Sequence, residues 1–196
     1  MIDLVHDVAE AYRELVLANS YPGDVVNLEE YVKHNQIETE LSRTLLLLAF
    51  MLLDAEVTFC VIDDADKEIT HLIKRMTYSK EESMEKADFI FIRRTASIKE
   101  KQEAFKTVKV GTLIDPHLSA TIICEVEALN EGDSYRLLGP GIDGVKQAQI
   151  QGFEDWNLIR AEKNKEFPLG IEIYLVDAKE QLMALPRTTT VTQGGK

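Results

Sequence analysis

Hydrophobic positions in the first half of the chain recur at two different spacings, which predict helices and strands in turn. Between residues 4 and 19, apolar or small side chains return every three or four positions, as expected of a helix with one buried stripe. Residues 45–53 are apolar without interruption and predict a helix that is buried on all sides. Helices are predicted at residues 4–19, 39–53, 66–76, 97–106 and 153–163. Short apolar runs predict strands at residues 25–28, 57–62 and 88–92.

The second half of the chain has the pattern of two antiparallel hairpins. Strands predicted at 120–129 and 135–138 flank the turn residues Asn-Glu-Gly-Asp, and strands at 171–176 and 181–185 flank a polar break. Because helix and strand alternate in the first half while hairpins need antiparallel pairing, the sheet should be mixed. We therefore expect a single three-layer α/β/α domain over residues 1–191, followed by a disordered tail at 192–196.

Composition and charge narrow the function classes. The chain has 196 residues, 45% of them apolar, and no linker divides it, so one substantial core is expected. A formal charge of −12 repels nucleic acid and acidic membranes, and no basic patch offsets it. The longest apolar run is well short of the roughly 18 residues that a membrane span needs, and the beginning of the chain lacks a secretory pattern. We expect a cytoplasmic protein that binds neither nucleic acid nor membrane.

Neither the cysteines nor the acidic residues have the spacing of a metal site. Cys60 and Cys124 lie in separate apolar runs with no neighbouring histidine, which favours buried free thiols. Asp63, Asp64 and Asp66 follow a predicted strand, where magnesium ligands occur, but a solvated acidic loop is the favoured interpretation. No metal is therefore predicted.

Motifs for nucleotide or nucleophile chemistry are also missing from the sequence. It contains no GxxxxGK phosphate loop, no GxGxxG between a strand and a helix, and no GxSxG elbow. Lys146, after a glycine-rich turn, is a weak candidate for a Schiff-base lysine. We predict no cofactor and assign no catalytic residue.

Five residues are candidates for contact with a ligand or a partner. Arg187 offers a planar fork that suits phosphate or phosphonate oxygens, and the hydroxyl of Thr188 is next to it; an intrachain ion pair is the alternative for Arg187. Gly139 and Gly141 flank a proline, and a tight turn is favoured over a ligand contact for them. Arg13 lies beside the apolar stripe of the first predicted helix, where pairing with a carboxylate is favoured over substrate contact.

Four sequence blocks resemble one known family. They are YRELVLANSYPG at 12–23, LLGPGI at 137–142, FPLGIEIYLV at 167–176 and LPRTTTV at 185–191. In order and in content they resemble PhnH, the H subunit of the bacterial phosphonate carbon-phosphorus lyase system, over nearly the whole chain. The chain departs from the family pattern at Tyr12, Asn19 and Glu172 by substitutions that keep size or charge.

The resemblance implies a fold and a role. The family's fold is similar to a reduced large domain of pyridoxal-phosphate-dependent transferases without the cofactor. Its role is that of a homodimeric subunit of the carbon-phosphorus lyase core complex, working with G, I, J and L subunits. With G, I and L it transfers the ribose triphosphate of ATP to methylphosphonate. A subunit that is not catalytic alone fits a sequence without a complete reactive centre. The alternatives are a free-standing phosphonate or nucleotide-dependent transferase, and a phosphonate or nucleotide sensor.

Overall fold

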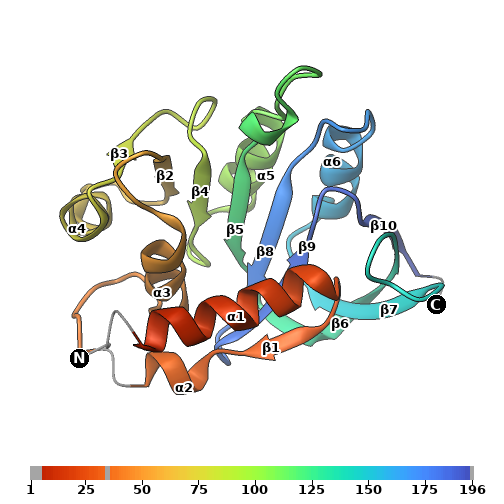
Figure 1. Ribbon diagram of the computed structural model, residues 1–196, viewed down its shortest axis with the longest axis horizontal. Coiled ribbons are helices and arrows are strands. Elements are labelled where there is room, and N and C mark those ends of the chain that lie inside the picture. Colours follow the sequence, from red (N-terminus) through yellow and green to blue (C-terminus); the bar gives the residue numbers. More distant parts are fainter. Residues whose placement is uncertain (1–5, 34–35, 195–196) are drawn as a thin grey trace.

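The computed structural model describes residues 6–33 and 36–194, which form a central sheet, a smaller second sheet and helices around them (Figure 1). The helices are α1 (His6–Ser20), α2 (Glu29–Val32), α3 (Arg43–Leu52), α4 (Glu68–Thr77), α5 (Ile98–Thr107) and α6 (Trp156–Lys163). The central strands are β1 (Val25–Asn27), β2 (Thr58–Ile62), β3 (Lys80–Glu81), β4 (Phe89–Ile92), β5 (Thr121–Glu125), β8 (Glu172–Val176) and β9 (Gln181–Leu185). The second sheet consists of β6 (Ala128–Leu138), β7 (Lys146–Gln151) and β10 (Thr190–Gln193).

The central sheet is mixed, which confirms the predicted α/β class. Its strand order is β1-β9-β8-β5-β4-β2-β3. Strands β3, β2, β4, β5 and β8 are parallel to one another. Strand β9 pairs antiparallel with β8, and β1 pairs antiparallel with β9. The β8 to β9 connection is the hairpin that the sequence predicted over 171–185.

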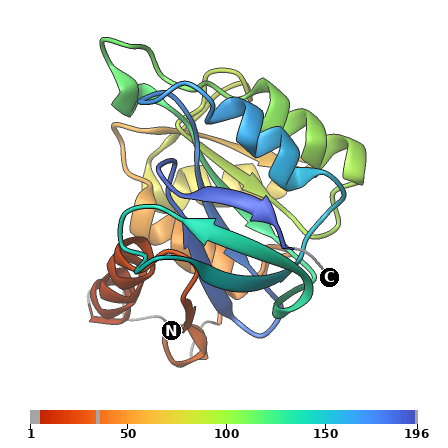
Figure 2. The same ribbon diagram turned by 90° about the vertical axis from the view of Figure 1, so that its right-hand side faces the viewer.

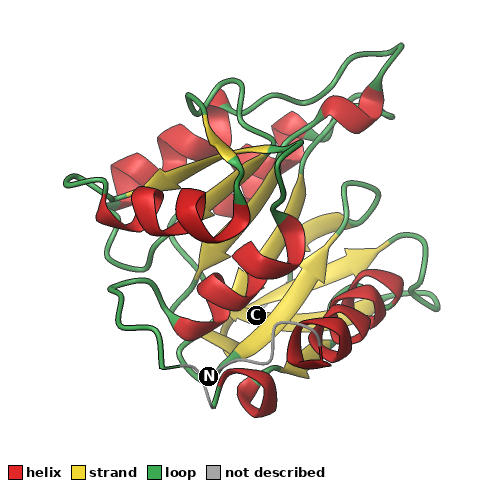
Figure 3. Cartoon of the chain, turned by 60° about the vertical axis from the view of Figure 1, so that its left-hand side comes forward, coloured by secondary structure: helices red, strands yellow, loops and turns green. Residues whose placement is uncertain are grey.

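Different elements cover the two faces of the central sheet. Helices α1, α3 and α4 bury their apolar sides against one face, in a cluster that includes Leu15, Leu46 and Ile73 (Figure 1, Figure 3). The other face packs against α5, α6 and the second sheet, with Phe105 and Trp156 fully or almost fully buried (Figure 2). The predicted three layers are thus modified, because a three-stranded sheet shares the second outer layer with two helices.

The predicted hairpin between 120–129 and 135–138 is wrong. Its first half divides into β5 of the central sheet and the start of β6, and β6 continues to Leu138 while pairing with β7. Asn130 and Gly132 do adopt positive φ angles of 62° and 89°, as turn residues should. Here they form a bulge, since Leu129 and Asp133 both pair with Ile150. The turn residues therefore interrupt the ladder without reversing the chain.

The predicted helices all occur, with shifted ends. The helix predicted from residue 39 begins at Arg43, because the side chain of Ser42 accepts a hydrogen bond from the Leu45 backbone at 3.3 Å. Its predicted burial is confirmed for residues 44–49, which are buried. At α5, Ser97 and Glu100 form a capping box, which explains why this polar helix begins where it does.

The expected disordered tail from residue 192 is wrong in its first part. Thr192 and Gln193 belong to β10 and pair with Arg136 and Tyr135, and Gly194 donates a backbone hydrogen bond to the Ser134 carbonyl at 2.7 Å. Residues 195–196 lie outside the described residues. Within the described part of the chain, no helix combines the length and the apolar character needed to cross a bilayer.

Candidate functional site

The parallel strands of the central sheet run in one direction, so they begin at one edge of the sheet and end at the opposite edge. Different residues lie at these two edges. Strands β2, β4, β5 and β8 end at one edge, here called the carboxyl edge, and begin at the opposite amino edge. The antiparallel strand β9 ends at the amino edge, so Arg187 lies there, together with the loop that precedes β5 and projects at the top of Figure 1.

Arg187 joins three chain segments at the amino edge. Its Nε donates to Glu172 Oε1 at 2.7 Å, and its backbone N–H donates to Glu172 Oε2 at 3.1 Å. Its Nη1 donates to the carbonyls of Pro116 at 2.6 Å and Pro168 at 3.3 Å. The guanidinium is therefore part of an intrachain ion pair, the alternative that the sequence left open. The neighbouring side chain of Thr188 is exposed.

Gly139 and Gly141 form a tight turn between two other family blocks. Gly139 has φ of 145°, and a Cβ there would lie 2.7 Å from the Thr188 carbonyl oxygen. Gly141 has φ of 81°, and a Cβ there would collide with the Ser20 carbonyl oxygen. Both positions therefore require glycine for conformation and for space. The turn also brings the C-terminus of α1 next to the segment that follows β9.

The structure brings the four family blocks into one connected group, here called the amino-edge junction. It consists of residues 20–23, 139–141, 167–172 and 186–189. Arg187 links the third of these to the fourth, Gly139 links the fourth to the second, and Gly141 links the second to the first. Segments far apart in sequence thus form one structural unit.

Arg160, on α6, is a buried member of this region that was not among the candidates from the sequence. It is 1% exposed, and it donates to the carbonyls of Thr189 at 2.8 Å, Pro186 at 2.7 Å and Leu185 at 3.3 Å. Burial lowers its pKa to about 10, against the opposing field of Glu172. Among the described residues its Nε and the Thr189 hydroxyl have no hydrogen-bond partner. Arg160 therefore holds the segment after β9 in place through backbone carbonyls.

Two of the three departures from the family pattern make specific contacts. Glu172 accepts the hydrogen bonds of Arg187 described above. Asn19 donates its side-chain amide to the Tyr174 hydroxyl at 2.8 Å, across the contact between α1 and β8. Tyr12, the third, is half exposed on α1 next to the exposed Arg13. The carboxylate pairing favoured for Arg13 is not found among the described residues.

The carboxyl edge contains a charged pocket of about 370 Å³, whose lining includes the acidic run Asp63, Asp64 and Asp66 that the sequence analysis interpreted as a solvated loop. Helix α4 follows β2 on one face of the sheet and α5 follows β4 on the other, so the pocket beyond these two strand ends lies at a topological switch point. Arg93 donates there to the Asp63 carbonyl at 2.6 Å and to Glu40 Oε2 at 3.2 Å. The signal that could have located it was the pair of polar runs directly after two adjacent parallel strands.

Asp64, one of the acidic residues that line this pocket, is held by hydrogen bonds within the protein. Burial opposes ionisation of Asp64, but hydrogen bonds from the Thr70 hydroxyl at 2.6 Å and its backbone N–H at 2.7 Å outweigh it and lower the pKa. Asp64 thereby holds the first turn of α4. Among the described residues there is no group of three or more His, Cys, Asp or Glu side chains arranged to hold a metal ion.

Lys146 and the cysteines lack the properties of nucleophiles. Lys146 Nζ pairs with Asp24 Oδ1 at 2.5 Å. Both thiols are free; Cys124 is buried, as predicted, whereas Cys60 is only half-buried. Burial raises the pKa of Cys60, and it raises that of Cys124 to about 12. The thiolate forms are therefore disfavoured at neutral pH.

Comparisons with known proteins identify the family. The model for "Bacterial phosphonate metabolism protein (PhnH)" matches residues 1–192. The chain is 32% identical over 186 residues to the "Putative C-P lyase subunit protein HtxG" of Stutzerimonas stutzeri, covering 94% of this chain and 86% of that protein. It is 34% identical over 102 residues to the "Alpha-D-ribose 1-methylphosphonate 5-triphosphate synthase subunit PhnH" of Rhizobium meliloti (strain 1021), covering 52% of this chain and 48% of that protein. The chain therefore belongs to the PhnH family.

Proposed function

We propose that the chain is a subunit of a carbon-phosphorus lyase core complex and is needed for the transfer of the ribose triphosphate of ATP to methylphosphonate. The observation that carries this proposal is the match to the PhnH family along nearly the whole chain. The names of two relatives, a C-P lyase subunit and a synthase subunit, support it. The chemistry of the described residues agrees, because Arg187 and Lys146 are ion-paired and the thiols are protonated at neutral pH.

The amino edge is the surface that we propose contacts partner subunits of the G, I, J or L type. Ile114 is 89% exposed, Phe167 is 75% exposed and Leu113 is 65% exposed. Arg187 ties the two loops that carry these side chains together, since it donates to Pro116 in one loop and Pro168 in the other. Large apolar groups presented on fixed loops favour protein association. In this proposal Arg187 and Thr188 act in docking, Arg187 by positioning the loops.

The finer features of the proposal come from the family resemblance and, for the cellular location, from the pattern of the sequence. We propose a homodimer located in the cytoplasm, built on a reduced large domain of the pyridoxal-phosphate transferase type without the cofactor. The mixed sheet with helices on both faces is compatible with that fold type. Light scattering of the purified chain tests the dimer, and a monomer at micromolar concentration would contradict it.

Reconstitution separates the subunit from a free-standing transferase. The purified chain, incubated with ATP and methylphosphonate, should release no adenine, whereas the mixture with the partner subunits should release it. Adenine release by the chain alone, at the rate of the mixture, would establish the transferase. A sensor would bind ATP or methylphosphonate by itself at micromolar concentration, which calorimetry measures.

Single substitutions test the proposed docking surface. Ile114→Asp and Phe167→Asp should each weaken co-purification with partner subunits about tenfold or more, because a charge in an apolar interface is left desolvated. Tyr78→Asp is the matched control, since Tyr78 is 77% exposed at the end of α4, next to β3, which β4 and β2 separate from β5 in the sheet. Equal co-purification of all three variants would remove the amino edge as the docking surface.

A further inference from the structure

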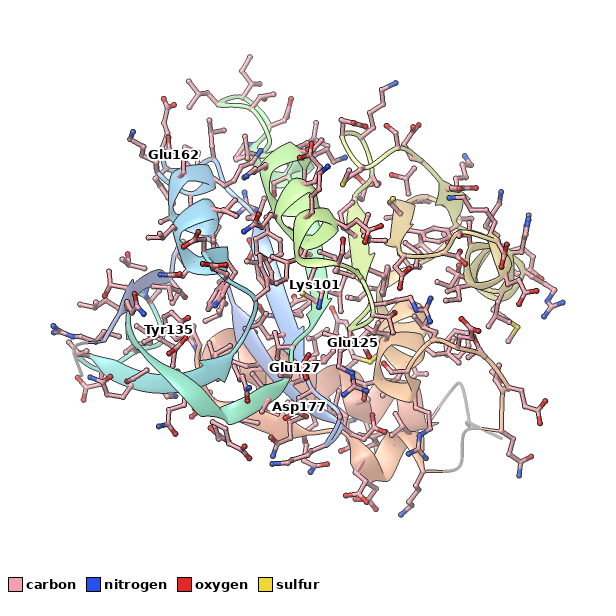
Figure 4. The ribbon with its side chains drawn as sticks, turned by 180° about the vertical axis from the view of Figure 1, so that it is seen from behind. Lys101, Glu125, Glu127, Tyr135, Glu162 and Asp177 are labelled. Atoms are coloured by element: carbon pink, nitrogen blue, oxygen red, sulfur yellow. The ribbon has the colours of Figure 1, made fainter. Side chains whose placement is uncertain are left out.

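A second cavity at the carboxyl edge has an unusual set of charges. It has a volume of about 260 Å³ and lies beyond the ends of β4 and β5, beside α5. Its polar lining consists of Arg94, Lys101, Glu125 and Glu127, and Ile98 and Phe153 contribute apolar surface. Figure 4 shows Lys101, from α5, near Glu125 and Glu127 at the end of β5. The size suits a ligand smaller than a nucleotide, since pockets for drug-sized molecules begin at about 300 Å³.

The backbone of Arg94 is fixed from two sides. Its N–H donates to Glu125 Oε2 at 2.7 Å, and its carbonyl accepts from Lys101 Nζ at 3.0 Å. The guanidinium, in contrast, forms no ion pair or hydrogen bond with any residue that the structure describes. Arg94 therefore lines the cavity with a backbone that is held in place and with guanidinium donors that are free to bind an anion.

The ammonium group of Lys101 has donors to spare. Lys101 is only 7% exposed, and an ammonium carries three N–H donors, of which one reaches the Arg94 carbonyl. No carboxylate pairs with it among the described residues. A buried charge is costly unless it is paired, so an anionic ligand beside Lys101 would be favoured.

Carboxylates balance the two cations. Glu125 accepts the Arg94 backbone N–H, whereas the exposed carboxylate of Glu127 has no partner among the described residues. The charges of the four side chains sum to zero, and the side chains of Arg94 and Glu127, which are of opposite sign, form no hydrogen bond or ion pair with the described residues. A simple anion would meet repulsion from Glu127, and a simple cation would meet repulsion from Arg94.

We propose that this cavity binds a small zwitterion of the amino-acid type. Its oxyanion group, a carboxylate or a phosphonate, pairs with Arg94 and Lys101, its ammonium pairs with Glu127, and its short carbon chain contacts Ile98 and Phe153. The proposal goes beyond the subunit function and does not depend on it, because it rests on the charges and contacts of one cavity.

Calorimetric titration of the purified full-length chain tests the charge requirement. The probes are glycine, β-alanine and 4-aminobutyrate as zwitterions of increasing length, with propionate and propylamine as the matched single charges. At least one zwitterion should bind about tenfold or more tightly than both single charges. The titration is then repeated with the aminoalkylphosphonate that has the same carbon chain as the tightest-binding zwitterion. The tighter of the two shows whether the cavity prefers a carboxylate or a phosphonate. Binding of propionate as tight as any zwitterion, or no zwitterion binding tighter than about 10 mM, would overturn the proposal.

Single substitutions test which residues of the cavity bind the zwitterion. Arg94→Gln and Glu127→Gln alter exposed side chains and should each weaken zwitterion binding about tenfold while propionate binding falls only in Arg94→Gln. Lys101→Met keeps the length of a buried side chain and should abolish binding, with folding verified by circular dichroism. Lys99→Gln, an exposed change on the same helix outside the cavity lining, should bind as the unaltered chain does. Unchanged binding by both Arg94→Gln and Glu127→Gln would contradict the assignment.

Discussion

Two arginines at the amino edge and Arg94 at the carboxyl edge of the central sheet use their side-chain donors in opposite ways. At the amino edge, Arg160 and Arg187 direct their donors at backbone carbonyls and at Glu172, and so connect chain segments that are distant in sequence. At the carboxyl edge, Arg94 has its backbone held while its guanidinium makes no contact with the described residues. Donors that bind other segments of the protein stabilise its surface, whereas free donors are available to bind a ligand. The contrast therefore gives Arg160 and Arg187 a structural role and makes Arg94 the candidate for contact with a ligand.

Removal of Arg160 should be the most damaging single change at the amino edge. Arg160→Ala leaves three buried or partly buried carbonyls without their donor and opens a cavity beside α6, which should lower the free energy of unfolding by about 3 kcal/mol or more. Urea denaturation measures this. Arg75→Ala, an exposed change on α4, is the control and should stay within about 0.5 kcal/mol. If the two variants are equally stable, the hydrogen bonds of Arg160 do not stabilise the fold, and its contrast with the free arginines is lost.

Arg187→Ala should have a smaller effect, because Arg187 is partly exposed. Loss of its hydrogen bonds to Pro116, Pro168 and Glu172 should cost about 1–3 kcal/mol. Arg187→Lys keeps the charge but not the fork, and it should recover only part of that stability. Thermal unfolding of the two variants measures the difference. If Arg187→Ala unfolds at the same temperature as the unaltered chain, the junction does not depend on this guanidinium.

An acidic group at the amino edge should make stability depend on pH. Burial opposes ionisation of Asp88, but hydrogen bonds from Lys109 at 2.5 Å and Thr58 at 2.7 Å outweigh it and lower its pKa. A lowered folded pKa contributes stability above the unfolded value near 3.9 and loses it as pH falls through the folded pKa. After screening is considered, the contribution is about 1 kcal/mol.

Asp88→Asn measures that contribution. The variant should be less stable than the unaltered chain at pH 7, and the difference should shrink toward pH 2, because the native carboxyl is then protonated as well. Urea midpoints at a series of pH values give the comparison. A difference that stays constant across the whole range would show that ionisation of Asp88 does not stabilise the fold.

Arg13→Ala should have the smallest effect on stability. Arg13 is exposed on α1 and forms no ion pair among the described residues, so the free energy of unfolding should change by less than about 0.5 kcal/mol. Chemical denaturation checks this value, and pull-down with partner subunits checks docking. A loss of more than about 1 kcal/mol would show that α1 has a structural contact outside the described residues.

Much of the fold was predictable because it follows from local periodicity. The stripe of α1, the all-apolar run of α3 and the β8 to β9 hairpin were each predicted from spacing alone. The hairpin after β5 was wrong, because Asn130 and Gly132 satisfy a bulge as well as a turn and only the pairing with β7 distinguishes them. The polar strand β7 was not predicted at all, since its apolar positions are few.

The candidate residues also divide into properties that the local sequence predicted and contacts that it did not. Residue types correctly suggested that Gly139 and Gly141 form a turn and that Arg187 was available for an ion pair. Spacing did not reveal that Glu172 and Pro116 would be its partners, or that Arg160 would be buried beside it. The paired cavities of the carboxyl edge went unnoticed because their lining residues come from separate loops.

By itself, the sequence determined the α/β class, the family and most helices and strands, because these depend on residue spacing and on blocks read in order. Only the tertiary structure decided which arginines bind other segments of the chain, which one is free, and which loops share an edge. Such properties depend on distances between segments that are remote in sequence, such as Asn19 and Tyr174, which are 155 positions apart. Local patterns carry no information about those distances, whereas packing of the sheet and its layers does.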